Sequence, residues 1–262
     1  MKKKIFISVI FIANLLLSHS SFADRKPFGL SYLSTGGNAR EFECEIWNQV
    51  NFGKGIGYYQ HWQPRIEFEY SPRDNFKTSL YLNFDEVKTE DDSLLPSPFS
   101  YHGTSVELLW TPFSSRHFYL PAFYLETSMN GFDLEFEPKL IFSQRFGSWI
   151  GAVNLIGEIE HEYPEHELEG AFNATAGLAF EASDSWSLGV EGQYLSTWEG
   201  LFEEQESSAI FAGPTVSWMT SSFYFTLNFV AQVSAAPATH EGLNFADFER
   251  YQIRTILGIP FR

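Results

Sequence analysis

The sequence of 262 residues has a single cysteine and few basic side chains. One thiol can form neither an intramolecular disulfide framework nor a cysteine-based zinc cluster. The 17 Lys and Arg stand against 33 Asp and Glu, and the resulting net charge of −16 argues against a nucleic-acid partner. With 44% apolar and 18% aromatic residues, the chain is not of the disordered type. We therefore expect one acidic, aromatic-rich folded domain.

The N-terminus has the three parts of a targeting segment. Lysines follow the first Met, an apolar run extends from Ile5 to Leu17, and Ser21-Phe22-Ala23 is a small-x-small site. We predict a signal peptide over residues 1–23, cleaved after Ala23, and a mature domain over residues 24–262. A membrane anchor is the alternative, but the apolar run is shorter than the roughly 20 residues of a spanning helix. No later run is long enough for a helical span.

Beyond the signal, apolar and acidic side chains alternate with a period of two. Ile66, Phe68 and Tyr70 alternate with Glu67 and Glu69, and similar segments recur to the end of the chain. Successive side chains of a strand point to opposite faces, so each segment has an apolar face and a carboxylate face. A helix would mix the two kinds.

Twelve segments carry this pattern, and the links between them alternate between long and short. One departure is the short third outer link, residues 128–131. Such links, joining an even number of segments of about 10 residues, are typical of outer-membrane barrels with short periplasmic turns. The sequence thus predicts an all-β fold, an antiparallel transmembrane β-barrel. Its expected strands are 40–50, 64–70, 76–86, 102–112, 117–127, 132–142, 148–160, 167–181, 186–196, 208–219, 223–234 and 249–261.

The last segment is the clearest transmembrane strand. An unbroken alternating face runs from Tyr251 to Phe261, and Arg262 follows as a small departure from an aromatic terminus. We expect the barrel-assembly machinery to read residues 249–261. A soluble β-sandwich shares the alternation, but it would bury its apolar faces between two sheets and needs no rhythm of short and long links.

If the apolar faces contact lipid, the opposite faces line the lumen. Carboxylates far outnumber cations on these faces. The residues that we predict to line the lumen are Glu43, Glu45, Glu67, Glu69, Glu107, Asp133, Glu135, Glu137, Glu158, Glu160, Glu191, Arg65, Lys77, Arg250 and Arg254.

So many carboxylates cannot share a dry interior, so the lumen must be hydrated, protonated or metal-bound, and hydration costs least. A hydrated acidic lumen favours cations over anions. A structural mesh of ion pairs around a closed lumen fits the same residues. Barrel closure pairs the first and last segments, which predicts that Arg250 and Arg254 lie beside Glu43 and Glu45.

No catalytic constellation emerges. His102 and Ser105 come nearest to the His and Ser of lipid-hydrolysing barrels, but the spacing differs and no orienting third group is evident. The acidic stretch with His161 and His166 could bind a divalent cation, yet an exposed loop is favoured. We therefore expect no enzyme, no catalytic residue, no cofactor and no metal site.

Several stretches of the expected strands carry a resemblance to known proteins: residues 40–47, 66–76, 79–83, 185–191, 212–215 and 254–261. They resemble uncharacterised bacterial outer-membrane β-barrels related to the porin-like family labelled for the MetA pathway of phenol degradation. The resemblance implies a barrel fold and at most porin-like passage of small organic solutes. It supplies no catalytic residues.

Together these patterns predict a Gram-negative outer-membrane barrel with an acidic lumen that passes small solutes or cations. Its expected partners are outer-membrane lipids, the barrel-assembly machinery and small solutes or cations, with no nucleic acid. A structural barrel with a closed lumen is the first alternative, and an outer-membrane lipid hydrolase is the second.

Overall fold

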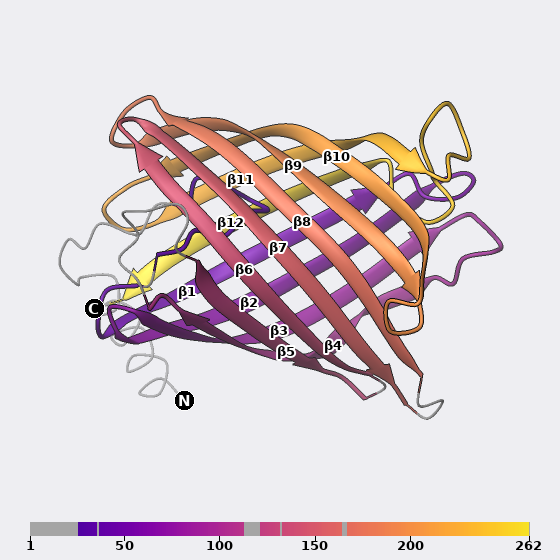
Figure 1. Cartoon of the computed structure of the whole chain (residues 1–262), viewed down its shortest axis with the longest axis horizontal. Helices are drawn as coiled ribbons and strands as arrows, with labels where there is room; N and C mark the ends of the chain where they lie inside the picture. The colour runs from indigo at the N-terminus through magenta and orange to yellow at the C-terminus, as the bar shows by residue number, and fades with distance from the viewer. Residues whose placement is uncertain (1–25, 36, 113–120, 132, 164–166, 262) are drawn as a thin grey trace, which may run out of the picture.

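The structure is a computed structural model that describes residues 26–35, 37–112, 121–131, 133–163 and 167–261. The signal peptide expected at residues 1–23 and its cleavage site lie outside these residues. Within them, twelve antiparallel strands form one closed barrel (Figure 1). The strands are β1 (Glu41–Phe52), β2 (Tyr59–Arg73), β3 (Phe76–Thr89), β4 (Ser97–Trp110), β5 (Ala122–Met129), β6 (Asp133–Phe146), β7 (Trp149–Glu162), β8 (Leu168–Glu181), β9 (Trp186–Glu199), β10 (Glu204–Met219), β11 (Tyr224–Ala236) and β12 (Tyr251–Phe261).

The predicted fold class and the number of strands are confirmed. Each predicted segment overlaps one strand, although several strands extend further than predicted; β2, for example, begins at Tyr59 rather than at residue 64. The extensions mix aromatic residues such as Trp62 and Phe99 with polar ones and show no regular alternation of apolar and acidic side chains. In the opposite sense, β5 begins only at Ala122, directly after Pro121, which has no N–H to donate to a strand ladder. No helix among the described residues is long and apolar enough to cross a membrane.

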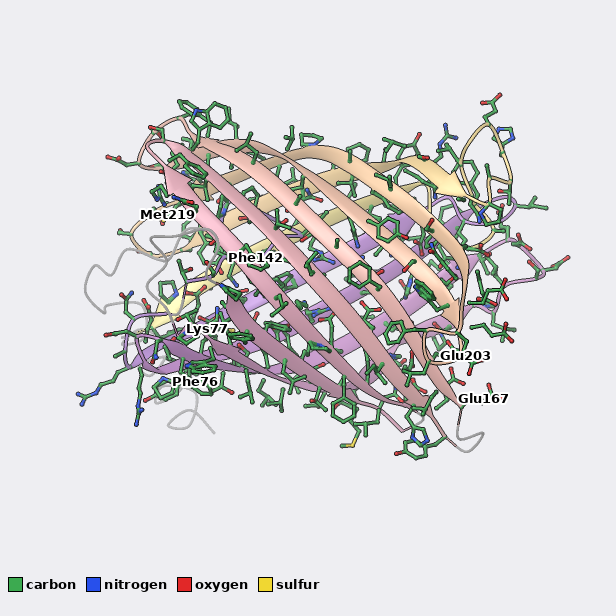
Figure 2. All side chains as sticks on the ribbon, in the orientation of Figure 1. Phe76, Lys77, Phe142, Glu167, Glu203 and Met219 are labelled. Carbon is green, nitrogen blue, oxygen red and sulfur yellow. The ribbon has the colours of Figure 1, made fainter. Side chains whose placement is uncertain are left out.

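The two ends of the barrel differ in the length of their connections. At one end, here called the turn end, most of the connections are short. The links 74–75 and 147–148 have two residues each, and the second contains Gly147 with φ of 62°; the exception at this end is the link 111–121 between β4 and β5. Most of the connections at the opposite loop end are longer, such as 90–96 and 237–250, while the link after Met129 is short, as predicted. Figure 2 shows acidic side chains such as Glu167 and Glu203 at the loop end.

The outer surface of the barrel is apolar. Strands β1 to β11 all expose large hydrophobic side chains, such as Leu188, Val190 and Phe229. Near the turn end, aromatic rings pair across neighbouring strands: Trp110 with Phe123 at 5.8 Å, Trp149 with Phe180 at 5.1 Å and Trp186 with Trp218 at 5.9 Å between centroids. An apolar band with an aromatic girdle is the surface that a membrane-spanning barrel presents to lipid.

The interior contains a piece of the chain itself. Residues 26–35, here called the N-terminal segment, run inside the barrel and appear in indigo within its walls (Figure 1). The ring of Phe28 packs against Ile150, Ala152 and Ala179. It also covers Gly177, where a Cβ would lie 2.6 Å from the ring, so this close approach requires glycine.

Candidate functional site

The N-terminal segment is held in the lumen by one carboxylate above all. The side chain of Glu191 on β9 accepts hydrogen bonds from three successive backbone N–H groups, those of Gly29, Leu30 and Ser31, at 2.8 to 2.9 Å. Asn228 on β11 donates a fourth, at 2.8 Å. Glu191 is 2% exposed, and four donors are the compensation that a buried carboxylate requires. Glu191 was predicted to face the lumen, and there it is an anchor for the chain.

Other strands bind the same segment from further sides. Asn154 on β7 exchanges two hydrogen bonds with the backbone of Tyr32, at 2.6 and 3.0 Å. Thr226 donates to the carbonyl of Lys26 at 2.6 Å, and Ser143 binds the backbone N–H of Ser34 at 2.8 Å. The segment is therefore held inside the lumen by strands β6, β7, β9 and β11.

Beside the segment, the turn half of the lumen holds a buried cluster of charged groups. Its carboxylates come from β1, β2 and β4, and its ammonium groups are Lys77 on β3 and Lys26 of the N-terminal segment. Lys77 lies 2.7 Å from Glu69, and Lys26 pairs with Glu45. Trp47 donates to Glu67 at 3.0 Å. The members of this cluster that were predicted to line the lumen are Glu43, Glu45, Glu67, Glu69, Glu107 and Lys77, all buried.

The loop half of the lumen is hollow. A cavity of about 320 Å³, here called the chamber, lies between β2–β9 and β12, and Leu30, Tyr32 and Trp47 contribute to its lining. A second cavity of about 640 Å³ continues from it towards the loop end and shares Glu135, Glu158 and Glu160 with it.

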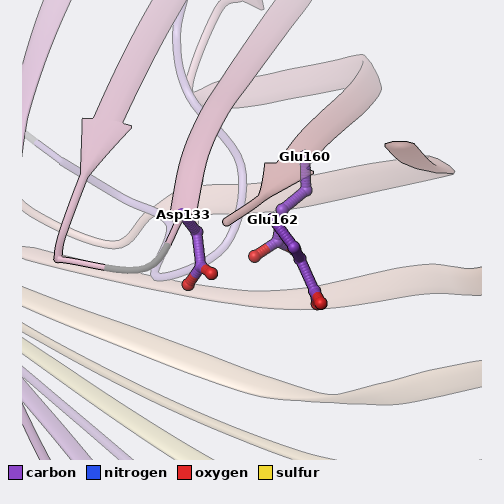
Figure 3. Close-up of side chains that lie close together, drawn as sticks. All are labelled: Asp133, Glu160 and Glu162. Carbon is purple, nitrogen blue, oxygen red and sulfur yellow. The ribbon is translucent and has the colours of Figure 1, made fainter. Parts of the chain in front are cut away.

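Carboxylates crowd one wall of the chamber. Oxygen atoms of Glu135, Glu137 and Glu158 lie within 4.8 Å of one another, and so do those of Asp133, Glu160 and Glu162 (Figure 3). Such oxygen sets are of the kind that a divalent cation can bind. Among the described residues, only Glu137 of the first set has a cation partner, Lys139 at 2.7 Å.

Two arginines face the same chamber. The guanidinium groups of Arg65 on β2 and Arg254 on β12 both lie over the ring of Trp47, at 5.9 and 5.8 Å from its centroid. Arg254 donates to Gln49 at 2.7 Å and to the carbonyl of Gly29 at 3.0 Å. The chamber lining thus has carboxylates on β3, β5, β6 and β7, the ammonium group of Lys139 on β6, and guanidinium groups on β2 and β12.

Two expectations about the arginines are wrong. Strands β1 and β12 do pair, but the antiparallel register sets Arg254 opposite Gln49, whereas Glu43 and Glu45 face Pro260 and Gly258. Arg250 directly precedes β12: its backbone N–H donates to the carbonyl of Phe52 at 2.9 Å, and its exposed guanidinium group lies over the rings of Phe245 and Tyr251. Antiparallel strands place the start of one beside the end of the other, so Arg250 is far along the strand from Glu43.

Three features of the lumen were not predicted. The burial of the N-terminal segment is one of them, although its alternation of Phe28, Leu30 and Tyr32 with small residues is a signal for it. The carboxylate sets depend on register, which places Glu135 opposite Glu160. The inward position of Trp47 follows from its parity with Glu45, but its role as a platform for two arginines needed the closed barrel.

Comparisons with known proteins agree on the fold. Residues 152–261 match the model of a family of unknown function (DUF6662). No curated protein matches the chain. A COG4313 outer membrane channel from Pseudomonas putida F1 superposes with a TM-score of 0.58 at 8% identity, covering 87% of this chain and 98% of that one. The NanC porin superposes with a TM-score of 0.54 at 7% identity, covering 84% and 99%.

The family match overlaps the C-terminal stretches on which the resemblance to outer-membrane barrels rested, and its description names no solute. At these identities the structural likenesses establish the architecture alone. The chain is therefore a closed twelve-stranded barrel with the fold of outer-membrane channels.

Proposed function

We propose that this protein is a narrow outer-membrane channel that admits small solutes from the loop end and favours cations over anions. The observation that carries this proposal is the chamber, whose carboxylates Glu135, Glu158 and Glu160 have no cation within 4.0 Å among the described residues. Charged groups of one sign in a low-dielectric wall concentrate counter-ions. The protein reaches the membrane through its signal peptide and the recognition of residues 249–261, and the loop end faces outward.

The N-terminal segment restricts passage in this proposal. Solutes that enter the chamber meet Leu30 and Tyr32, and beyond them the turn half is packed by three apolar clusters around Tyr224, Phe28 and Leu109. Ions pass beside this segment, or pass when it shifts. The dense set of hydrogen bonds on the segment also favours a second candidate, a structural barrel with a closed lumen.

Conductance in planar bilayers separates the two candidates. We expect small current steps from the folded protein, with a reversal potential in a KCl gradient that shows K⁺ to be preferred over Cl⁻. A variant with Glu135→Gln, Glu158→Gln and Glu160→Gln should lose most of this preference, while the matched control Asp184→Asn, in an exposed turn at the other end, should keep it. Folded protein that shows no current steps would contradict the channel and support the structural barrel with a closed lumen.

We include the absence of catalysis in the proposal. Ser105 is buried and shares hydrogen bonds with Asn83 and Ser128 at 2.8 and 2.9 Å rather than with a histidine base. A serine nucleophile needs a positioned base. Incubation with phospholipid and Ca²⁺ should release no fatty acid; released fatty acid would overturn this part.

A further inference from the structure

The chamber combines carboxylates and guanidinium groups that the protein pairs only in part. On β6 and β7, Glu135 and Glu158 have no ion pair within 4.0 Å among the described residues. Glu158 accepts a hydrogen bond from Asn173 at 2.8 Å, and its carboxyl group also contacts that of Glu137. The carboxylate oxygens of Glu135 and Glu158 lie within 4.8 Å of each other. An ammonium group with several donors fits between them.

The two arginines of the chamber lack close carboxylate partners. Arg65 has Glu126 as its nearest carboxylate, at 3.9 Å, which is too long for a hydrogen bond. Arg254 has no carboxylate within 4.0 Å in the described part of the chain, and its known acceptors are the neutral groups of Gln49 and Gly29. Two guanidinium groups on one indole ring repel each other, and a carboxylate between them would bind both in the bidentate way that arginine favours.

Neutral groups of the chamber also lack partners. The side-chain oxygens of Asn83 and Gln193 are buried atoms without a hydrogen-bond partner among the described residues, and both residues line the chamber. Unsatisfied buried acceptors are uncommon in folded proteins and mark positions where a donor is expected. They are independent of the charged groups, and water in the chamber or a ligand with N–H or O–H donors would satisfy them.

From these observations we infer that the chamber binds small zwitterions of the amino-acid type. The ammonium group lies between Glu135 and Glu158, and the carboxylate lies on Arg65 and Arg254 above Trp47. The volume of about 320 Å³ is at the lower end of the range for small-molecule sites. A molecule without net charge also avoids the repulsion that the acidic entrance imposes on anions. This inference rests on the proposed function, because it names the solute class of the same chamber.

Calorimetric titration of the folded full chain in detergent tests the inference. The probes are glycine, 4-aminobutyrate and 6-aminohexanoate, whose charges are increasingly far apart. The probe that binds most tightly is then compared with its two single-charge analogues, for example 4-aminobutyrate with butylammonium and butyrate. We expect the zwitterion to bind about tenfold or more tightly than either analogue, since each analogue loses one charge-assisted contact. Equal binding of the zwitterion and the ammonium analogue would overturn the inference and leave a cation site.

Variants assign the two ends of the ligand. Glu158→Gln should weaken the binding of both the zwitterion and the ammonium analogue. Arg254→Gln should weaken the binding of the zwitterion but strengthen that of the ammonium analogue, because it removes the repulsion between the guanidinium and ammonium groups. A merely structural role of Arg254 would not produce this opposite response. Arg65→Gln repeats the test if Arg254→Gln fails to fold. The control Arg73→Gln, in an exposed position at the turn end, should change nothing. Unchanged zwitterion binding in both chamber variants would overturn the inference.

The bilayer experiment on the same preparation keeps the two proposals apart. Zwitterion binding without any current steps would contradict the channel and support the chamber as a binding site. Current steps with no preference for zwitterions over single-charge analogues in the titration would support the channel and overturn the inference.

Discussion

In the turn half of the lumen, Lys77 lies 2.7 Å from the buried carboxylate of Glu69, whereas in the loop half Glu135 has no cation within 4.0 Å in the described part of the chain. Both residues belong to the inward face of an alternating strand. The difference comes from the N-terminal segment, which excludes water from the turn half, so that charges there need protein partners. In the loop half a cavity of about 320 Å³ leaves room for water and solute. The path of the N-terminal segment therefore decides whether an inward carboxylate such as Glu69 or Glu135 is packed or faces a cavity.

Deleting the N-terminal segment should remove the difference between the two halves of the lumen, and we expect the largest effect on conductance from this change. Deletion of residues 26–35 leaves Glu191, Asn154 and Asn228 facing an open lumen, so we expect a severalfold rise in single-channel conductance. Replacing the same residues by a Gly/Ser stretch of equal length is the control, since it keeps the chain but loses the side-chain contacts. A conductance unchanged by the deletion would mean that the segment does not limit passage.

Loosening the segment without removing it should have the next largest effect. Glu191→Ala takes the acceptor from four buried donors, each worth about 1–3 kcal/mol when unsatisfied. In a Cys44→Ser background, a Ser31→Cys probe should react with a water-soluble thiol reagent about 100-fold faster, the factor that corresponds to about 3 kcal/mol. Glu191→Gln, which keeps one acceptor oxygen, should fall between. Equal labelling rates would show that the other contacts of the segment hold it without Glu191.

The buried Lys77–Glu69 pair tests whether the turn half of the lumen excludes water. Lys77→Met leaves Glu69 without its cation, and breaking a buried pair costs about 3–5 kcal/mol. The temperature at which the folded band is lost on a denaturing gel should drop clearly. Lys88→Met is the matched control, because Lys88 pairs with Glu86 at 2.8 Å on the surface and such pairs contribute little. A similar drop in both variants would contradict a dry turn half.

Neutralising one chamber carboxylate should change stability least. Glu135→Gln removes a charge that has no cation partner among the described residues, so we expect the free energy of unfolding to change by no more than about 0.5 kcal/mol. The reversal potential in a KCl gradient should nevertheless move towards zero. A clear loss of stability would mean that Glu135 belongs to the packed structure rather than to a hydrated chamber.

Much of this molecule follows from local patterns. Alternation such as Ile66-Glu67-Phe68-Glu69 assigns side chains to faces, because the strand period of two is a property of the backbone. The rhythm of link lengths then predicts a closed antiparallel barrel, and the short link after Met129 was recognised in the same way. These features depend only on neighbours in the sequence.

The candidate site depends on contacts between distant residues. Parity places Glu191 and Arg254 inside, but it cannot show that Glu191 binds Gly29, 162 positions away, or that Arg254 faces Gln49 rather than Glu45. The same parity rule treats Glu69 and Glu135 alike. Alternation along the strands predicts which side chains face inward, with Arg250 as an exception. Which of these charges are packed and which line a chamber is a property of the fold, because burial depends on the path of residues 26–35 through the closed barrel.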